Sequence, residues 1–273
     1  MNHKISNQRT SFAKKSLGQN FLVDEAFVRK IVDATRVSKE DTVIEIGPGR
    51  GALTRHLVER AGRVVTIELD SHLVSLLKRE FGNHDNFEMI QADVLKLDLL
   101  SIAGDSKVKL VANLPYYIST AVLQRLIEQR RAFSDMVLMF QREVADRIVA
   151  QPGNSERGYL SVLVDTFLVV EQLFDVPPSA FKPAPKVWSS VIRIFPKETD
   201  PVLIGRENQF ERLVGASFRQ KRKTIANNLK TAASELNIPD ANVLLDRANI
   251  DPKRRAETLT IDEWVNLFTN YAA

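Results

Sequence analysis

The feature that most constrains the fold is a regular alternation of short Val- and Ile-rich runs with segments of helical periodicity. Five runs read as strands, at 42–47, 63–70, 87–93, 109–115 and 135–141. The segments between them place apolar residues at i, i+3 and i+4, as amphipathic helices do. This alternation predicts an α/β fold with a parallel sheet covered by helices on both faces. Two helical segments, 142–150 and 159–167, precede two further predicted strands at 167–176 and 189–195.

The pattern changes at residues 196–201, PKETDP, where two prolines and two acids interrupt it. Beyond this point no run reads as a strand. Helices are predicted at 207–220, 224–236, 241–250 and 260–273, with Thr260 or Asp262 as the cap of the last one. The sequence therefore predicts two domains, an α/β domain at 1–200 and a small all-helical domain at 201–273.

Composition excludes several kinds of chemistry. The 273 residues include no cysteine, which removes disulfides, thiolate catalysis and Cys-based zinc sites. The four histidines have no metal-ligand spacing, so we expect no metal. No apolar run approaches the roughly 18–20 residues of a membrane span. The first residues lack the apolar core of a secretory signal and only weakly resemble a transit peptide, so a cytoplasmic location is expected.

The net charge of +4 is unevenly placed. Residues 1–20 carry Lys4, Arg9, Lys14 and Lys15 with no acid, and residues 218–230 hold five cations with no carboxylate. Such patches suit a polyanion better than a small acidic metabolite. Taken singly, each is equally consistent with a solvated basic surface.

A glycine-rich turn, Gly47-Pro48-Gly49-Arg50-Gly51, follows the first predicted strand. Glycines allow a tight turn and a close approach of the backbone to a nucleotide. Glu68 ends the next strand, 21 positions after Gly47, where a carboxylate can accept hydrogen bonds from both ribose hydroxyls. The pair indicates an adenosine-containing cofactor. With Ala52 the turn also satisfies the NAD pattern, so a dehydrogenase is an alternative.

Polar residues at the next two strand ends favour S-adenosylmethionine over NAD. Asp93 ends the third strand and could accept from an adenine amino group, and Asn113 ends the fourth. Both lie at the carboxyl edge of the predicted sheet, where ligands of open α/β sheets bind. Asp93 could instead cap the segment that follows it.

The stretch VANLPYYIS, 111–119, has the chemistry needed to methylate an exocyclic amine. The Asn113 side-chain carbonyl and the backbone carbonyl of Leu114 or Pro115 are two acceptors that could orient the amine and stabilise its developing charge. Proline restricts the local backbone, so little reorganisation is needed. No strong base is required, because the alkylated cationic nitrogen loses its proton readily.

Two aromatic residues could hold the target base. Tyr116 follows the acceptors directly, and stacking on such a ring is worth roughly 1–3 kcal/mol per base. Phe181 lies in a proline-rich segment and could provide the second ring of an adenine clamp. The alternatives are that Phe181 is a core residue and that Tyr116 is the first residue of a helix.

The segments SLGQNFL, EIGPGRGALT, IELD, QADVL, NLPYYIS and FKPAPKVWSS together resemble the ribosomal RNA adenine N6,N6-dimethyltransferases. The likeness is greatest to the bacterial small-subunit type and runs from about Lys14 through the basic helical tail.

The resemblance implies a Rossmann-like class I methyltransferase that uses S-adenosylmethionine. It would transfer four methyl groups, two to each of two adjacent adenines near the 3′ end of 16S rRNA, and take part in small-subunit biogenesis. The expected partner is the small ribosomal subunit and its 16S rRNA, with no membrane or metal, and the expected state is a monomer.

The resemblance also assigns roles to residues. Cofactor contacts fall on Asn20, Leu22, Gly47, Glu68, Asp93 and Asn113. Catalytic-loop and stacking positions fall on Asn113, Leu114, Pro115, Tyr116 and Phe181. Candidates for phosphate contacts are Lys14, Lys15, Arg219, Lys221, Arg222 and Lys223.

Two alternatives remain within RNA biology. One is the related large-subunit enzyme type that confers macrolide resistance. The other is an assembly factor whose main role is to bind the immature small subunit.

Overall fold

A computed structural model describes residues 19–272, and its centre is a seven-stranded sheet of order β4-β3-β2-β5-β6-β9-β7. The strands are β2 (Thr42–Ile46), β3 (Arg63–Glu68), β4 (Phe87–Gln91), β5 (Val108–Asn113), β6 (Phe133–Gln141), β7 (Leu168–Val176) and β9 (Ser189–Pro196). Two-residue strands β1 (Phe21–Leu22) and β8 (Phe181–Lys182) pair antiparallel beside it. All seven predicted strands are present, and the α/β fold is confirmed.

The prediction of a parallel sheet is right for the first five strands and wrong for the two pairings that β9 makes. Neighbours from β4 to β6 run parallel, whereas β9 is antiparallel to both β6 and β7. The chain between β7 and β9 contains one 3₁₀ turn and β8 but no α-helix. Without a crossover helix, the chain returns beside β7 in the opposite direction.

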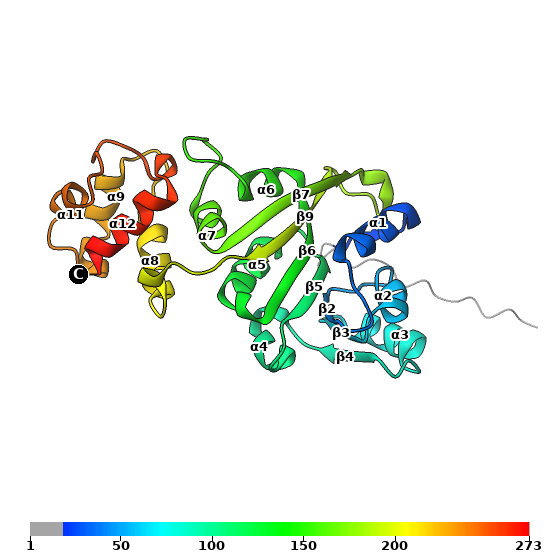
Figure 1. Cartoon of the computed structure of the whole chain (residues 1–273). Coiled ribbons are helices and arrows are strands. Elements are labelled where there is room, and N and C mark those ends of the chain that lie inside the picture. Colours follow the sequence, from blue (N-terminus) through cyan, green and yellow to red (C-terminus); the bar gives the residue numbers. More distant parts are fainter. Residues whose placement is uncertain (1–18, 273) are drawn as a thin grey trace, which may run out of the picture.

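Helices cover both faces of the sheet (Figure 1). One buried cluster joins α1 (Glu25–Thr35), α2 (Thr54–Arg60) and α3 (Ser71–Phe81) to the sheet through Val43, Val111 and Val137. The other face is covered by α4 (Leu99–Ala103), α5 (Ser119–Glu128), α6 (Arg142–Ile148) and α7 (Tyr159–Phe167), which pack on side chains that alternate with the first set, such as Ile44 and Leu110.

Helix α1 has no counterpart in the predicted helices, although the sequence carries signals for it. Asp24 caps it by accepting from the amides of Ala26 and Phe27. Its buried residues include Val28, Ile31 and Val32, which have helical spacing.

After β9 the described residues form only helices, namely α8 (Glu207–Ser217), α9 (Ile225–Thr231), α10 (Ala233–Leu236), α11 (Ala241–Arg247) and α12 (Ile261–Tyr271). Thr260, rather than Asp262, caps α12, through reciprocal hydrogen bonds with Glu263. The single helix predicted at 224–236 is wrong, because the chain breaks into α9 and α10 at Ala232.

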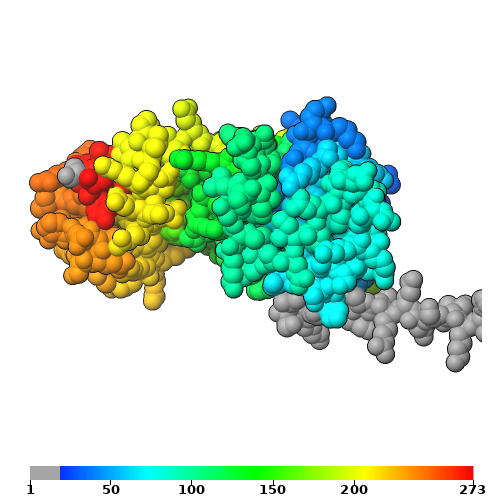
Figure 2. All heavy atoms as spheres, turned by 90° about the horizontal axis from the view of Figure 1, so that it is seen from below, coloured from blue at the N-terminus to red at the C-terminus, as the bar shows by residue number. Residues whose placement is uncertain are grey.

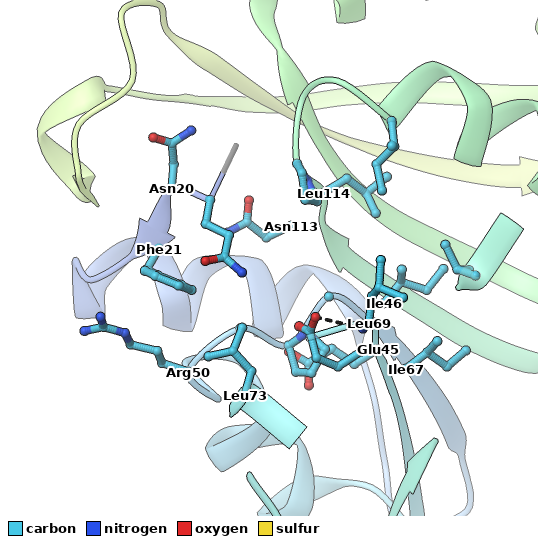
Figure 3. A pocket seen from close by; sticks show the side chains of 18 of the residues that line it. Asn20, Phe21, Glu45, Ile46, Arg50, Ile67, Leu69, Leu73, Asn113 and Leu114 are labelled. Carbon is cyan, nitrogen blue, oxygen red and sulfur yellow. Dashed lines mark hydrogen bonds between the residues drawn. The ribbon is translucent and has the colours of Figure 1, made fainter. Parts of the chain in front are cut away.

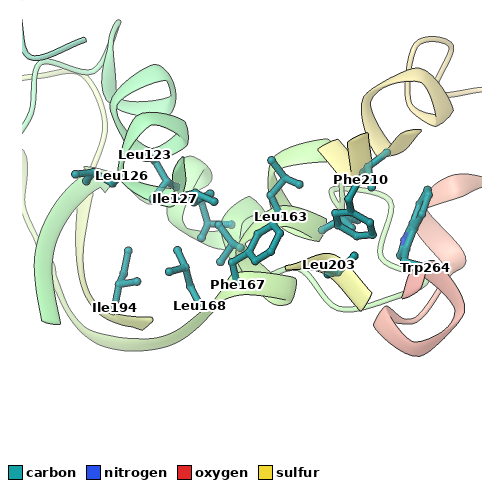
Figure 4. Close-up of a cluster of buried hydrophobic side chains, with 14 of the residues drawn as sticks. Leu123, Leu126, Ile127, Leu163, Phe167, Leu168, Ile194, Leu203, Phe210 and Trp264 are labelled. Carbon is teal, nitrogen blue, oxygen red and sulfur yellow. The ribbon is translucent and has the colours of Figure 1, made fainter. Parts of the chain in front are cut away.

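These helices lie at one end of an elongated molecule (Figure 2), yet one apolar cluster crosses the boundary near residue 200. Phe210 of α8 meets Phe167 of α7 edge-on at 6.0 Å and Phe268 of α12 at 5.6 Å. The row of side chains from Leu126 through Phe167 and Phe210 toward Trp264 is seen in Figure 4. The division into two domains therefore stays a prediction.

A buried arginine also joins the two parts. Arg130, just after α5, donates to Thr199 Oγ1 at 2.9 Å and pairs with Glu207 of α8 at 3.3 Å. Its guanidinium also lies 4.3 Å from the centre of the Phe167 ring. The linker and the start of α8 are thereby attached to the sheet region.

Candidate functional site

A cavity opens at the carboxyl edge of the parallel strands, where α/β sheets bind their ligands. It contains about 1090 Å³ of empty space including its mouth, which is ample for a nucleoside. Its lining includes all six residues predicted to contact the cofactor, Asn20, Leu22, Gly47, Glu68, Asp93 and Asn113. In Figure 3, Asn20 and Phe21 approach from β1, and Asn113 and Leu114 from the end of β5. The structure thus brings together residues that are up to 93 positions apart in the sequence.

The glycine turn has a backbone that only glycine adopts readily. Gly47, Gly49 and Gly51 have φ values of +67°, +58° and +79°. A Cβ on Gly51 would lie 2.5 Å from the Phe81 ring, and one on Gly49 would lie 3.1 Å from the Phe21 ring. The predicted tight turn is confirmed. The turn reaches the cavity wall through Gly47, Pro48, Gly49 and Arg50.

Glu68 is held in place by the backbone of the turn that follows β3. Its Oε1 accepts from the amides of Leu69 at 2.8 Å and Asp70 at 2.9 Å. Burial raises the pKa of this carboxyl above its usual value, although the backbone amides oppose that shift. The geometry fixes an acceptor at the end of β3, and its bond to a ribose stays a prediction.

Asp93 caps a turn and also lines the cavity, and its contact with an adenine stays a prediction. Its Oδ1 accepts from the amide of Leu95 at 3.1 Å and caps a 3₁₀ turn, Val94–Lys96. The side chain is one-third exposed and lines the cavity. Capping therefore orients Asp93 without withdrawing it from the cavity.

The segment after Asn113 distinguishes the two candidate backbone acceptors. Asn113 is the last residue of β5 and pairs with Met139. A Cβ on Gly47 would lie 3.7 Å from the backbone carbonyl oxygen of Asn113. The carbonyl of Pro115 already accepts from the amide of Ile118, at 3.2 Å. The carbonyl of Leu114 is therefore the better candidate to accept from a substrate amine.

Tyr116 lies in the turn before α5, which begins only at Ser119. Its hydroxyl is bonded to Ser189 Oγ at 2.7 Å, and burial raises the pKa of its phenol. The alternative that Tyr116 starts the helix is wrong. The ring is anchored in the cavity wall beside Asn113.

Phe181 lies elsewhere. It is 4% exposed, pairs with Leu22 through β8, and belongs to the core cluster under α1 and α2. It is not among the described residues that line the cavity. This placement fits the core alternative, and its role as a second stacking ring stays a prediction.

One cavity residue that sequence reasoning missed is Glu45, the first residue of EIGPG. It is 1% exposed, and Thr54 Oγ1 donates to its Oε2 at 2.7 Å. Burial raises its pKa from the ordinary 4.5 to about 8, while the Thr54 hydrogen bond opposes the shift. An acid in a strand that is otherwise apolar was the available signal.

The predicted phosphate contacts that the structure describes lie far from the cavity, on the turn between α8 and α9. Lys221, Arg222 and Lys223 are exposed there. Arg219 is also exposed, but it forms an ion pair with Glu235 of α10. Lys14 and Lys15 lie outside the described residues.

Residues 19–272 contain neither a membrane-spanning helix nor a metal-binding cluster. No helix in this part of the chain is long and apolar enough to cross a membrane. No group of three or more His, Asp or Glu side chains there has an arrangement that could hold a metal ion.

Comparison with known proteins gives a consistent result. A family model described as ribosomal RNA adenine dimethylase matches residues 10–272. The ribosomal RNA small subunit methyltransferase A of Alkaliphilus oremlandii is 42% identical over 262 residues, covering 94% of this chain and 91% of its own length. The protein of the same name from Clostridium botulinum is 44% identical over 256 residues, with coverages of 93% and 92%.

Two solved structures are similar over nearly the whole chain. A dimethyladenosine transferase from Plasmodium falciparum superimposes with a TM-score of 0.75 at 28% identity, covering 90% of this chain and 95% of that one. The 23S rRNA methyltransferase ErmE gives a TM-score of 0.66 at 24% identity, with coverages of 93% and 100%. At that identity the second match supports the fold alone.

Proposed function

Because the chain belongs to the ribosomal RNA adenine dimethylase family and is an S-adenosylmethionine-dependent rRNA methyltransferase, we propose that it methylates N6 of two adjacent adenines. These adenines lie near the 3′ end of 16S rRNA in the small ribosomal subunit. The observation that carries the proposal is the position of Asn113, at the end of β5 and in the wall of the same cavity as the glycine turn.

The cavity residues divide between cofactor and substrate. Asn20 and Leu22 approach from β1, and Gly47, Glu68 and Asp93 follow the ends of β2, β3 and β4. We assign the ribose to Glu68 and the adenine to Asp93, because these carboxylates lie at successive strand ends. S-adenosylmethionine supplies an electrophilic methyl carbon, and Asn113 lies at the strand end where the cofactor and target base would meet.

Asn113 and Leu114 then orient the target amine. In the first transfer, the side-chain carbonyl of the first and the backbone carbonyl of the second accept the two hydrogens of the amine, which directs the nitrogen lone pair at the methyl carbon. The nitrogen then loses one proton, so a single hydrogen remains to be accepted in the second transfer. Both dipoles stabilise positive charge as it develops on the nitrogen. Pro115 restricts the loop, and the bond between Tyr116 and Ser189 holds the ring against which the base stacks.

The helical segment 201–273 binds RNA in this proposal. Lys221, Arg222 and Lys223 contact phosphates from the α8–α9 turn, and they contribute affinity without reading sequence. One chain supplies every proposed group, so we propose a monomer that acts in the cytoplasm, where ribosomal subunits assemble.

The test uses small subunits purified from cells that lack this protein, incubated with the enzyme and a radiolabelled methyl donor. We expect label in dimethyladenine near the 3′ end of the 16S rRNA. Label found only in large-subunit RNA would contradict the substrate assignment. The exposed residue Asn242 provides a control, because Asn242→Ala should methylate normally whereas Asn113→Ala should not.

The large-subunit alternative has less support. Relatives at 42% identity or more carry the small-subunit name, whereas ErmE is 24% identical. The assembly-factor alternative is tested by the same Asn113→Ala variant. If that variant supported normal subunit maturation without methylation, binding would be the main role.

A further inference from the structure

The segment 182–188, KPAPKVW, connects two places on the cavity wall, and we call this segment the rim. At its start, Lys182 pairs with Phe21, which lines the cavity. At its end, Ser189 holds the hydroxyl of Tyr116, another lining residue, at 2.7 Å. Both ends of the segment are therefore attached to the cavity wall, on the side where Tyr116 would receive the target base.

Trp188 is the largest exposed apolar side chain of this rim. It is 48% exposed, and its neighbour Val187 is 40% exposed. Tyr117, which follows Tyr116 and also lines the cavity, is 59% exposed. Large apolar side chains gathered beside a functional cavity are typical of a binding surface.

The backbone of Trp188 is fixed. Its carbonyl accepts from the amide of Arg142 at 2.9 Å, and the next residue pairs with both Gln141 and Val176 in the sheet. The Cα atoms of Trp188 and Ser189 are about 3.8 Å apart, so the indole begins close to the residue that anchors Tyr116. A ring on such a support loses little conformational entropy when it binds.

The segment that carries Trp188 is positively charged. Lys182 and Lys186 are exposed in the same seven-residue segment, which contains no acid. Arg142 is nearby, although it pairs with Asp175 at 3.6 Å. An exposed aromatic ring among cations is the arrangement by which proteins bind unpaired nucleotides, with stacking on the base and attraction to the phosphate.

We propose that Trp188 stacks on an unpaired base of the rRNA that flanks the target adenine, while Lys182 and Lys186 face the phosphates beside it. The inference rests on the proposed function, because an RNA strand reaches this rim only if its adenine enters the cavity. Trp188 is thus a substrate-positioning residue, distinct from Tyr116.

The test is steady-state methylation of small subunits from cells that lack the protein, with Trp188→Leu, Trp188→Ala and Trp188→Phe. Loss of stacking should raise the KM for subunits between about 5-fold and 150-fold in the Leu and Ala variants. The Phe variant should stay within a few-fold of wild type, since it keeps an aromatic face. Cofactor affinity and thermal stability should not change in any of them. Val169→Ala is the matched control. Val169 is 44% exposed, and it pairs with Phe195, at the end of β9 that is distant from Trp188.

The Trp188→Leu variant distinguishes stacking on an RNA base from contact with an apolar protein partner. A protein contact would tolerate Leu as well as Phe, so equal KM values for those two variants would overturn the proposal. An unchanged KM in the Ala variant would overturn it as well. In either case wild-type methylation still stands, whereas no methylation by the wild type would mean that the proposed function has failed.

A second measurement uses the fact that the chain has two tryptophans and that Trp264 is fully buried. In enzyme labelled with 5-hydroxytryptophan, fluorescence that acrylamide can quench reports mainly on Trp188. Binding of small subunits should reduce acrylamide quenching of the wild-type fluorescence. In Trp188→Phe, the small quenching that remains should be the same with and without subunits. Full quenching in the presence of saturating subunits would contradict stacking.

Discussion

The cavity and the basic turn between α8 and α9 hold their functional groups in opposite ways. In the cavity, backbone contacts hold two of the carboxylates: Glu68 accepts from two amides, and Asp93 caps a turn. On the basic turn, Lys221, Arg222 and Lys223 extend from an exposed backbone. Methyl transfer depends on angles and needs fixed acceptors, whereas attraction to phosphate depends mainly on charge and tolerates mobile side chains.

The backbone of the basic turn is nevertheless held by a buried side chain of α9. Asn228 of α9 is 2% exposed, and its Oδ1 accepts from the amide of Gln220 at 2.9 Å. Its Nδ2 donates to the carbonyls of Gln220 and Thr224 at 3.2 and 3.3 Å. The backbone of the turn is therefore positioned, and only its cationic side chains are left to adapt.

The largest effect should come from the core that joins the two regions. Phe210→Ala removes a fully buried ring and should lower the free energy of unfolding by roughly 3–5 kcal/mol. Urea unfolding followed by circular dichroism and by Trp264 fluorescence should show one shared transition, because a single cluster crosses the boundary. Two separate transitions would support independent domains, and Phe210→Leu is the milder control.

The second-largest effect should come from the buried acid Glu45, which lines the cavity and has no counterpart on the basic turn. Glu45 has a pKa of about 8 when folded and an ordinary value of 4.5. Between these values the folded chain keeps a proton that the unfolded chain has lost, so stability falls as pH rises. Relative to Glu45→Gln, the wild type without cofactor should lose at most about 4 kcal/mol between about pH 5 and pH 8.

Urea unfolding at several pH values measures this difference. A constant difference between the two proteins would show that the folded pKa is not raised. Glu143→Gln is the control, since that side chain is 71% exposed.

Asn113→Ala tests the fixed acceptors of the cavity. Removing one preorganised electrostatic group should lower the single-turnover methylation rate about 100- to 1000-fold. The subunit affinity should stay nearly unchanged, because the basic turn is intact. A loss of subunit binding in proportion to the loss of rate would show that the two regions are not separable in this way.

The basic turn should show the opposite pattern. Replacing Lys221, Arg222 and Lys223 together with Ala should weaken subunit binding roughly 10- to 100-fold at physiological salt. The slope of log affinity against log salt should become shallower by about 2–3. At saturating subunits the methylation rate should match wild type, and a lower rate there would place the turn in the chemical step.

The smallest effect is expected for Arg219→Ala. Its guanidinium is already paired with Glu235, so a phosphate contact would have to compete with that ion pair. We expect Arg219→Ala to change the subunit affinity by less than about 3-fold. Lys221→Ala should reduce that affinity by a larger factor. Equal effects of the two variants would show that the ion pair opens when RNA binds.

Several features of the fold were beyond local sequence reasoning. β1 and β8 are two residues long and pair across 159 positions, from Leu22 to Phe181, so no periodicity reveals them. The antiparallel direction of β9 depends on the connection after β7 and not on the strand sequences, which read like the others. Helix α1 was different, because its cap and apolar spacing were readable in the sequence.

The aromatic residues show the same limit within the site. The sequence offered Tyr116 as a stacking ring and Phe181 as a possible second one. The bond to Ser189, 73 positions away, holds Tyr116 in the cavity wall, while packing under α1 and α2 places Phe181 in the core. Burial of Glu45 is likewise a property of the assembled sheet.

The glycine turn and the order of Glu68, Asp93 and Asn113 at successive strand ends could be read from the amino-acid sequence alone. These features depend on local backbone preference and on the strand period, and parallel strands then bring their carboxyl ends to one edge. Tertiary structure alone decided which ring faces the cavity, which carbonyl is the better acceptor and which arginine is already paired. Each of those outcomes depends on a partner distant in sequence or on the shape of a turn, and neither is encoded in the identity of a single residue.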